Sequence, residues 1–91
     1  MAITTRKLLK FYSKDKDGRI KLRKLFQMAL DEGFITEQEY WLLIYAYAER
    51  RMVENTCAKL AICQKTYHII LNQALIKINY TICKLDKLYT L

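Results

Sequence analysis

Residues 53–67 decide the fold, and they are Val53-Glu54-Asn55-Thr56-Cys57-Ala58-Lys59-Leu60-Ala61-Ile62-Cys63-Gln64-Lys65-Thr66-Tyr67. The part from Glu54 to Leu60 has the length of about two helical turns. A tight turn is predicted over 61–63, and a longer helix is predicted to start near Gln64. This second helix has apolar residues at the i, i+3, i+4 and i+7 spacing of an amphipathic helix. They are Tyr67, Ile70, Leu71, Ala74, Leu75 and Ile78.

The chain before this stretch is also predicted to be helical. Thr36 and Glu39 have the spacing of a capping box, at the start of a helix that runs to about Arg51. We expect Trp41 to be buried at least in part. The core stripe of this helix is predicted to be Tyr40, Leu43, Ile44 and Tyr47.

Two more helices are predicted in the N-terminal third. Thr5 is placed to cap a helix that runs to about Ser13. A polar loop over 13–18 follows, and the next helix is predicted over 19–32. Gly33 is placed to end that helix in the left-handed conformation. Residues 79–91 either continue the last long helix or form a short separate one.

Composition supports an all-α fold. The 91 residues include no Pro and only two Gly, and 53% of them are hydrophobic, which favours helices around one modest core. We therefore predict a small helical bundle of about five helices in a single compact domain. Within it we distinguish a basic helical pair (1–35), a central unit (36–80) and a C-terminal helical tail (81–91).

The chain shows no sign of a membrane segment. Its longest uncharged apolar run, Tyr40 to Ala48, is far shorter than the roughly 20 residues that a membrane span needs. The first five residues lack the apolar core of a signal peptide. We expect the three cysteines to be reduced thiols. We also expect the protein to be cytoplasmic and not to bind a membrane.

The positive charge is unevenly distributed. The net charge is +7 overall, with +7 in residues 1–30, −4 in residues 31–56 and +4 in residues 57–91. Two basic ends around an acidic middle indicate a polyanionic partner. The alternative interpretation of this charge is a solvated lysine surface that serves solubility.

The central stretch has the spacing of a helix-turn-helix, a unit that holds its second helix in the DNA major groove. Ala58 is expected where the two helices cross closely, Ile62 is expected to point inward, and Cys63 occupies the cap position. Gln and Asn side chains bind adenine, and Lys binds guanine or phosphate. The predicted DNA contacts are Lys59, Gln64, Lys65, Thr66, His68 and Asn72.

Residues 36–78 resemble region 4 of bacterial sigma-70-type factors and their small phage and mobile-element relatives. The family phrase E-I-A-x-x-L-G-I-S-x-x-T-V corresponds to residues 55–67, with Asn55-Thr56 in place of the usual acidic entry. The family phrase A-L-x-K-L corresponds to Ala74-Leu75-Ile76-Lys77-Ile78. Ala61 stands where the family has the turn glycine, and Cys63 stands where it has the serine cap. The resemblance implies a small transcription regulator that binds promoter DNA, beside or through RNA polymerase.

This interpretation assigns double-stranded DNA as the partner, with RNA polymerase as a second one. A homodimer through the apolar residues of 81–91 remains open, as does their folding back onto the bundle. The basic helical pair supplies candidate phosphate contacts from the side. They are Arg6, Lys7, Lys21, Arg23 and Lys24.

Other functional classes have less support in the sequence. With one His and no glycine-rich phosphate loop, we expect no enzyme and no catalytic residues. The three Cys and His68 do not match a common zinc spacing, so we expect no metal and no cofactor. The alternative function is a protein-binding module that inhibits or redirects RNA polymerase or another host factor. Its interface would be the helix over 36–51 or the N-terminal basic pair.

Overall fold

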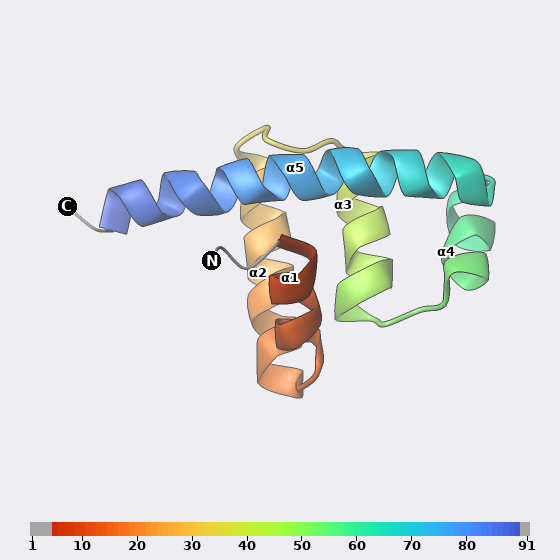
Figure 1. Ribbon diagram of the computed structural model, residues 1–91, viewed down its shortest axis with the longest axis horizontal. Helices are drawn as coiled ribbons and strands as arrows, with labels where there is room; N and C mark the ends of the chain where they lie inside the picture. The colour runs from red at the N-terminus through yellow and green to blue at the C-terminus, as the bar shows by residue number, and fades with distance from the viewer. Residues whose placement is uncertain (1–4, 90–91) are drawn as a thin grey trace.

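The computed structural model describes residues 5–89, and the side chains of residues 5–84. It confirms an all-α fold, with no strand in the described range. Helix α5 lies across one end of the other four helices, which extend away from it to one side (Figure 1). The elements are α1 (Thr5–Ser13), α2 (Lys16–Asp31), α3 (Glu37–Leu43), the π-helical turn η1 (Ile44–Ala48), α4 (Val53–Leu60) and α5 (Gln64–Tyr89).

The corner between α1 and α2 is tighter than the sequence predicted. Helix α2 begins at Lys16, within the expected loop, because the Asp15 carboxylate caps it by accepting the N–H of Gly18 at 2.6 Å. Arg19 donates to the carbonyl of Ser13 at 3.1 Å, which ties the two helices together. Gly18 is buried, and a methyl group on it would overlap the backbone carbonyl of Tyr12.

Two predicted helix boundaries are confirmed. Gly33 has a φ of +77°, and the N–H groups of Gly33 and Phe34 donate to carbonyls in the last turn of α2 at 3.1 and 2.8 Å, as in a Schellman motif. Thr36 and Glu39 form the predicted capping box at the start of α3. Thr5 behaves differently, because it is the first residue of α1 and its hydroxyl donates to Asn79 of α5.

Helix α3 lies in the middle of the bundle and packs against α2, α4 and α5. Leu43, Ile44 and Tyr47 are buried as predicted, and Tyr40 is half-buried. Leu42 is buried too, because neighbours cover α3 on more than one side. Trp41 is 44% exposed and packs against the rings of Tyr40 and Tyr45.

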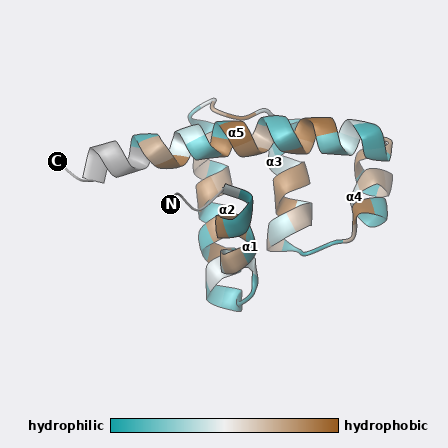
Figure 2. Ribbon diagram, in the orientation of Figure 1, coloured by the Kyte–Doolittle hydropathy of each residue, from teal (hydrophilic) through white to brown (hydrophobic). Residues whose placement is uncertain are grey.

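The predicted C-terminal tail continues α5 as one helix to Tyr89. Hydrophobic and hydrophilic segments alternate along α5 (Figure 2), as expected for a helix with one face on the core. Ile82 is half-buried against that core, whereas the side chains of Leu85 and Leu88 lie outside the described residues. Across the described chain, no helix has the length and apolar character needed to cross a membrane.

Candidate nucleic-acid interface

A three-residue turn joins α4 to α5. Its first residue, Ala61, is left-handed with φ +56° and ψ +46°. The N–H of Ile62 donates to the carbonyl of Cys57 at 3.0 Å, and the Ile62 side chain is half-buried against the core. The turn therefore changes the direction of the chain sharply, so that α4 lies below the first turns of α5 and runs crosswise to it (Figure 1).

The face of α4 that packs on the core differs from the expectation. Ala58, predicted at the helix crossing, is exposed, whereas Thr56 and Cys57 are buried. Val53 and Leu60 are partly buried on the same side. The reason is the i, i+3, i+4, i+7 spacing of Val53, Thr56, Cys57 and Leu60, which places Ala58 on the opposite face. Burial also raises the pKa of the Cys57 thiol.

Cys63 occupies the cap position of α5. Its carbonyl accepts the N–H of Tyr67 at 2.9 Å, and its Sγ lies 3.2 Å from the Thr66 hydroxyl. Hydrogen bonding from the Thr66 hydroxyl, and then from backbone N–H groups of the first turn, lowers the pKa of this exposed thiol. Thr66 therefore uses its hydroxyl in the cap and is only half-exposed.

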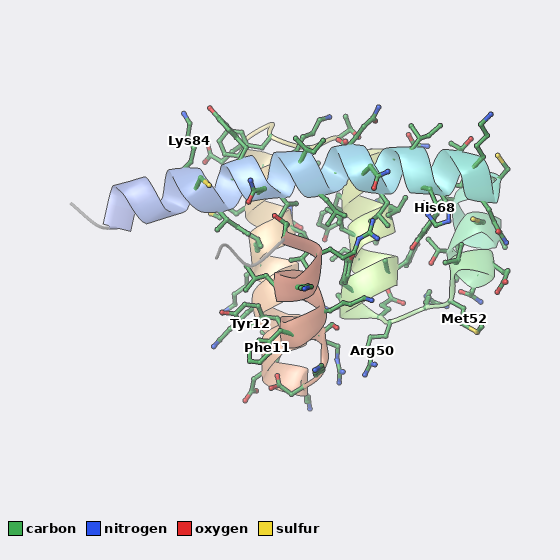
Figure 3. All side chains as sticks on the ribbon, viewed as in Figure 1. Phe11, Tyr12, Arg50, Met52, His68 and Lys84 are labelled. Carbon is green, nitrogen blue, oxygen red and sulfur yellow. The ribbon has the colours of Figure 1, made fainter. Side chains whose placement is uncertain are left out.

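The predicted base contacts are divided between two places. Gln64, Lys65 and His68 are exposed at the start of α5, and Figure 3 places His68 beside its first turns. Lys59 is exposed on α4. Asn72 lies farther along α5, where its Oδ1 accepts a hydrogen bond of 3.3 Å from Arg6 of α1.

The predicted phosphate contacts do not form one surface. Arg6 is brought to α5 by its bond to Asn72, and Lys7 lies next to it on the exposed side of α1. Lys21 lines a hollow with Leu8 and Ile82. A separate hollow, beside Gln27 and Tyr40, is lined by Arg23 and Lys24.

An ion pair that the sequence did not predict fixes α5 to α3. The Nζ atom of Lys77 lies 2.9 Å from Oε1 of Glu39. Glu39 is buried, and the same oxygen accepts the N–H of Thr36 at 2.8 Å. Burial alone would raise the pKa of Glu39, but the N–H of Thr36 and the ammonium of Lys77 together lower it. The two residues are 38 positions apart, so no local pattern could pair them.

The outer face of α5 is more apolar than expected. Ile69 is 49% exposed. Ile76 and Tyr80 are 71% and 54% exposed. These three residues, with spacings of seven and four, form an apolar stripe along one side of the helix.

No group of three or more His, Cys, Asp and Glu side chains in the described part of the chain is arranged to hold a metal ion. Of the three cysteines, Cys57 is buried, and Cys63 and Cys83 are exposed. The chain matches no protein-family model, and no curated protein and no solved structure matches it.

Replacing Ala61 by Gly is expected to raise the free energy of unfolding by about 0.5–1 kcal/mol, because glycine adopts the left-handed conformation without the penalty of a Cβ atom. Urea unfolding of the two proteins measures the difference. Ala58→Gly is the control, since the same change inside α4 should destabilise by about 1 kcal/mol. A destabilising Ala61→Gly substitution would mean that the turn is not left-handed at this residue.

Proposed function

We propose that the chain is a sequence-specific DNA-binding protein in which α4 and α5 act as a helix-turn-helix. The observation that supports this most is the exposed polar start of α5, set on α4 by a three-residue turn. Gln64, Lys65 and His68 are on the surface there, free of the core contacts that hold the later turns. A helix presented in this way has the geometry of one that enters a major groove.

Charge favours the same end of the molecule for a polyanion. The N-terminus of α5 carries the positive end of a helix dipole. Lys65 lies within its first turn, and Lys59 is exposed on α4 close before it. Asn72 is a weaker candidate than the first three, because a base would have to replace Arg6 as its hydrogen-bond partner. Arg6 in turn is the predicted phosphate contact that lies nearest to the base-contacting residues.

The test is fluorescence anisotropy with duplexes from the neighbouring genomic DNA and a random duplex, over a series of salt concentrations. We expect Lys65→Ala to weaken binding about tenfold and to lower the slope of log K against log salt by about one. Lys84→Ala, which removes the same charge from the far part of α5, is the matched control. If both variants behave like the parent chain, or if all duplexes bind equally and weakly, α5 is not a DNA-recognition helix.

Within this proposal, the resemblance to sigma region 4 makes promoter DNA the target and RNA polymerase a second partner.

The apolar stripe of Ile69, Ile76 and Tyr80 favours the second candidate function, a protein-binding module, because exposed apolar side chains in a row are typical of docking surfaces. An Ile76→Ser variant separates the two. Loss of biological activity in this variant with unchanged DNA affinity would favour protein docking. Loss of activity on substitution of Gln64 and Lys65 instead would favour DNA recognition.

A further inference from the structure

A hollow of about 370 Å³ lies between α1 and the segment that follows η1. Four of the residues that line it are cationic, two from each side. They are Lys10, Lys14, Arg50 and Arg51. None of these four residues is among the DNA and phosphate contacts predicted from the sequence, although they fall in the two segments considered for a protein interface.

The positive charge of this hollow is only partly neutralised. Arg51 pairs with Glu49 at 2.8 Å. Within the described chain, Lys10, Lys14 and Arg50 form no ion pair at all. Three uncompensated cations around one hollow repel each other, and an anion placed among them would remove that repulsion.

Arg51 is held in place before any ligand arrives. Its Nη1 atom donates to Asn55 at 2.9 Å, its Nε atom donates to Glu49, and its guanidinium lies 5.5 Å from the centre of the Tyr45 ring. A guanidinium fixed in this way loses little conformational freedom when it binds a ligand. The other three cations line the same hollow as this fixed group.

Arg50 has an unusual backbone conformation, with a φ of +54°. Glycine would take that conformation without strain. Non-glycine residues in this region often mark functional sites, where the side chain is needed despite the strain. The lysines have a structural explanation, because cations stabilise the C-terminal end of a helix such as α1. The left-handed conformation of residue 50 also has one, because it lets the N–H of Arg51 donate to the carbonyl of Tyr45 at 2.8 Å where the helix ends. Neither explanation requires an arginine side chain at this position, where glycine would be unstrained.

The hollow lies away from the proposed DNA-binding end. Figure 3 shows Arg50 at the end of the bundle farthest from α5, while His68 marks the first turns of α5. The molecule is about 27 Å across in this direction. The hollow is therefore a different part of the surface from the first turns of α5.

We propose that the hollow between α1 and Arg50–Arg51 binds the phosphate groups of a second ligand. A guanidinium group can donate to two oxygens of one phosphate at once, and the two lysines add charge without directional demands. The ligand is either a small polyphosphate compound or the backbone of a second nucleic-acid segment. The site stands whether or not α5 recognises DNA.

The first experiment is isothermal titration of the full chain with inorganic tripolyphosphate, which presents phosphate without a base or sugar. We expect Arg50→Gly to weaken binding about tenfold while its unfolding midpoint is unchanged or raised, because the strain at residue 50 is relieved. Lys84→Gln removes one charge from the opposite end of the molecule (Figure 3) and should change the affinity less than twofold. Equal weakening by both variants would reduce the effect to overall charge and overturn the proposal.

The second experiment distinguishes the two sources of phosphate. Energy transfer between donor- and acceptor-labelled random duplexes measures whether one protein bridges two nucleic acids. Bridging that Arg50→Gly abolishes identifies a nucleic-acid backbone, and tripolyphosphate binding without bridging identifies a small phosphorylated ligand. If neither bridging nor tripolyphosphate binding occurs, the phosphate site is overturned. It is also overturned if polyglutamate binds as tightly and with the same dependence on Arg50, and this result would favour an acidic protein partner.

Discussion

Replacing Gly18 by Ala is expected to lower the free energy of unfolding by about 2–3 kcal/mol, although the same substitution inside a helix normally stabilises by about 1 kcal/mol. The cause is the close approach of α2 to α1. An added Cβ atom would lie 2.7 Å from the carbonyl carbon of Tyr12 and closer still to its oxygen. Both atoms belong to the backbone, so the overlap is relieved only by moving one helix away from the other.

The measurement is thermal and urea unfolding of the two proteins. For a chain of this size, 2–3 kcal/mol corresponds to a fall in the unfolding midpoint on the order of 10–20 °C. Lys16→Ala, an exposed position in the same helical turn, is the control and should change stability by less than about 0.5 kcal/mol. A Gly18→Ala protein as stable as its parent would show that α1 and α2 do not meet at this glycine.

Replacing Glu39 by Ala is expected to destabilise the protein by about 2 kcal/mol. About 1 kcal/mol comes from the capping box, since Glu39 no longer accepts the N–H of Thr36. The rest comes from the ion pair with Lys77, which is limited to about 1 kcal/mol because the Lys77 side chain is 42% exposed. Loss of the pair also frees α5 from its one ionic contact with α3 in the described chain.

The same carboxyl group gives the protein a predictable acid sensitivity. The pKa of Glu39 is lower in the folded protein than its ordinary value of 4.5. Between the two values the unfolded chain binds the proton and the folded chain does not, so stability decreases as the pH falls. The contribution is fully present above the ordinary pKa and is lost as the pH falls through the lowered one.

Urea unfolding between about pH 3 and pH 7 tests this acid sensitivity. Glu39→Gln can still accept the N–H of Thr36 but has no proton to gain, so its stability should depend less on pH than that of the parent chain. Glu37→Gln is the matched control, because Glu37 is exposed in the same turn of α3. A parent chain and a Glu39→Gln variant with parallel pH profiles would exclude the lowered pKa.

The parts of the fold that the sequence predicted are those with a local physical cause. Gly33 ends α2 and Thr36 starts α3 because backbone groups within a few residues need partners, and that need is visible in the sequence. The apolar series of α5 is also local, since it repeats along one helix. The start of α2 was predicted too late in the chain, because a polar segment that contains a glycine is typical of a loop. In the structure Asp15 caps the helix, and the glycine lies in its first turn.

The parts that could not be predicted depend on contacts between distant segments. Glu39 and Lys77 are each unremarkable in the sequence, and only the packing of α5 over α3 brings them together. Asn72 and Arg6 meet for the same kind of reason. The exposure of the predicted site residues at the start of α5 could be predicted without knowing any distant contact, because the apolar series of α5 lies on the opposite face of the helix. The basic hollow, by contrast, combines α1 with residues about 40 positions later.

Arg50 and Ala61 are the two non-glycine residues with positive φ in the described chain, and they lie on either side of α4. Each such residue costs roughly 1 kcal/mol relative to a relaxed backbone. Because this strain is relieved when α4 leaves the core, we expect α4 to detach at a lower free energy than it would between relaxed residues. We therefore expect the helix that supports the start of α5 to be the first part of the fold to open.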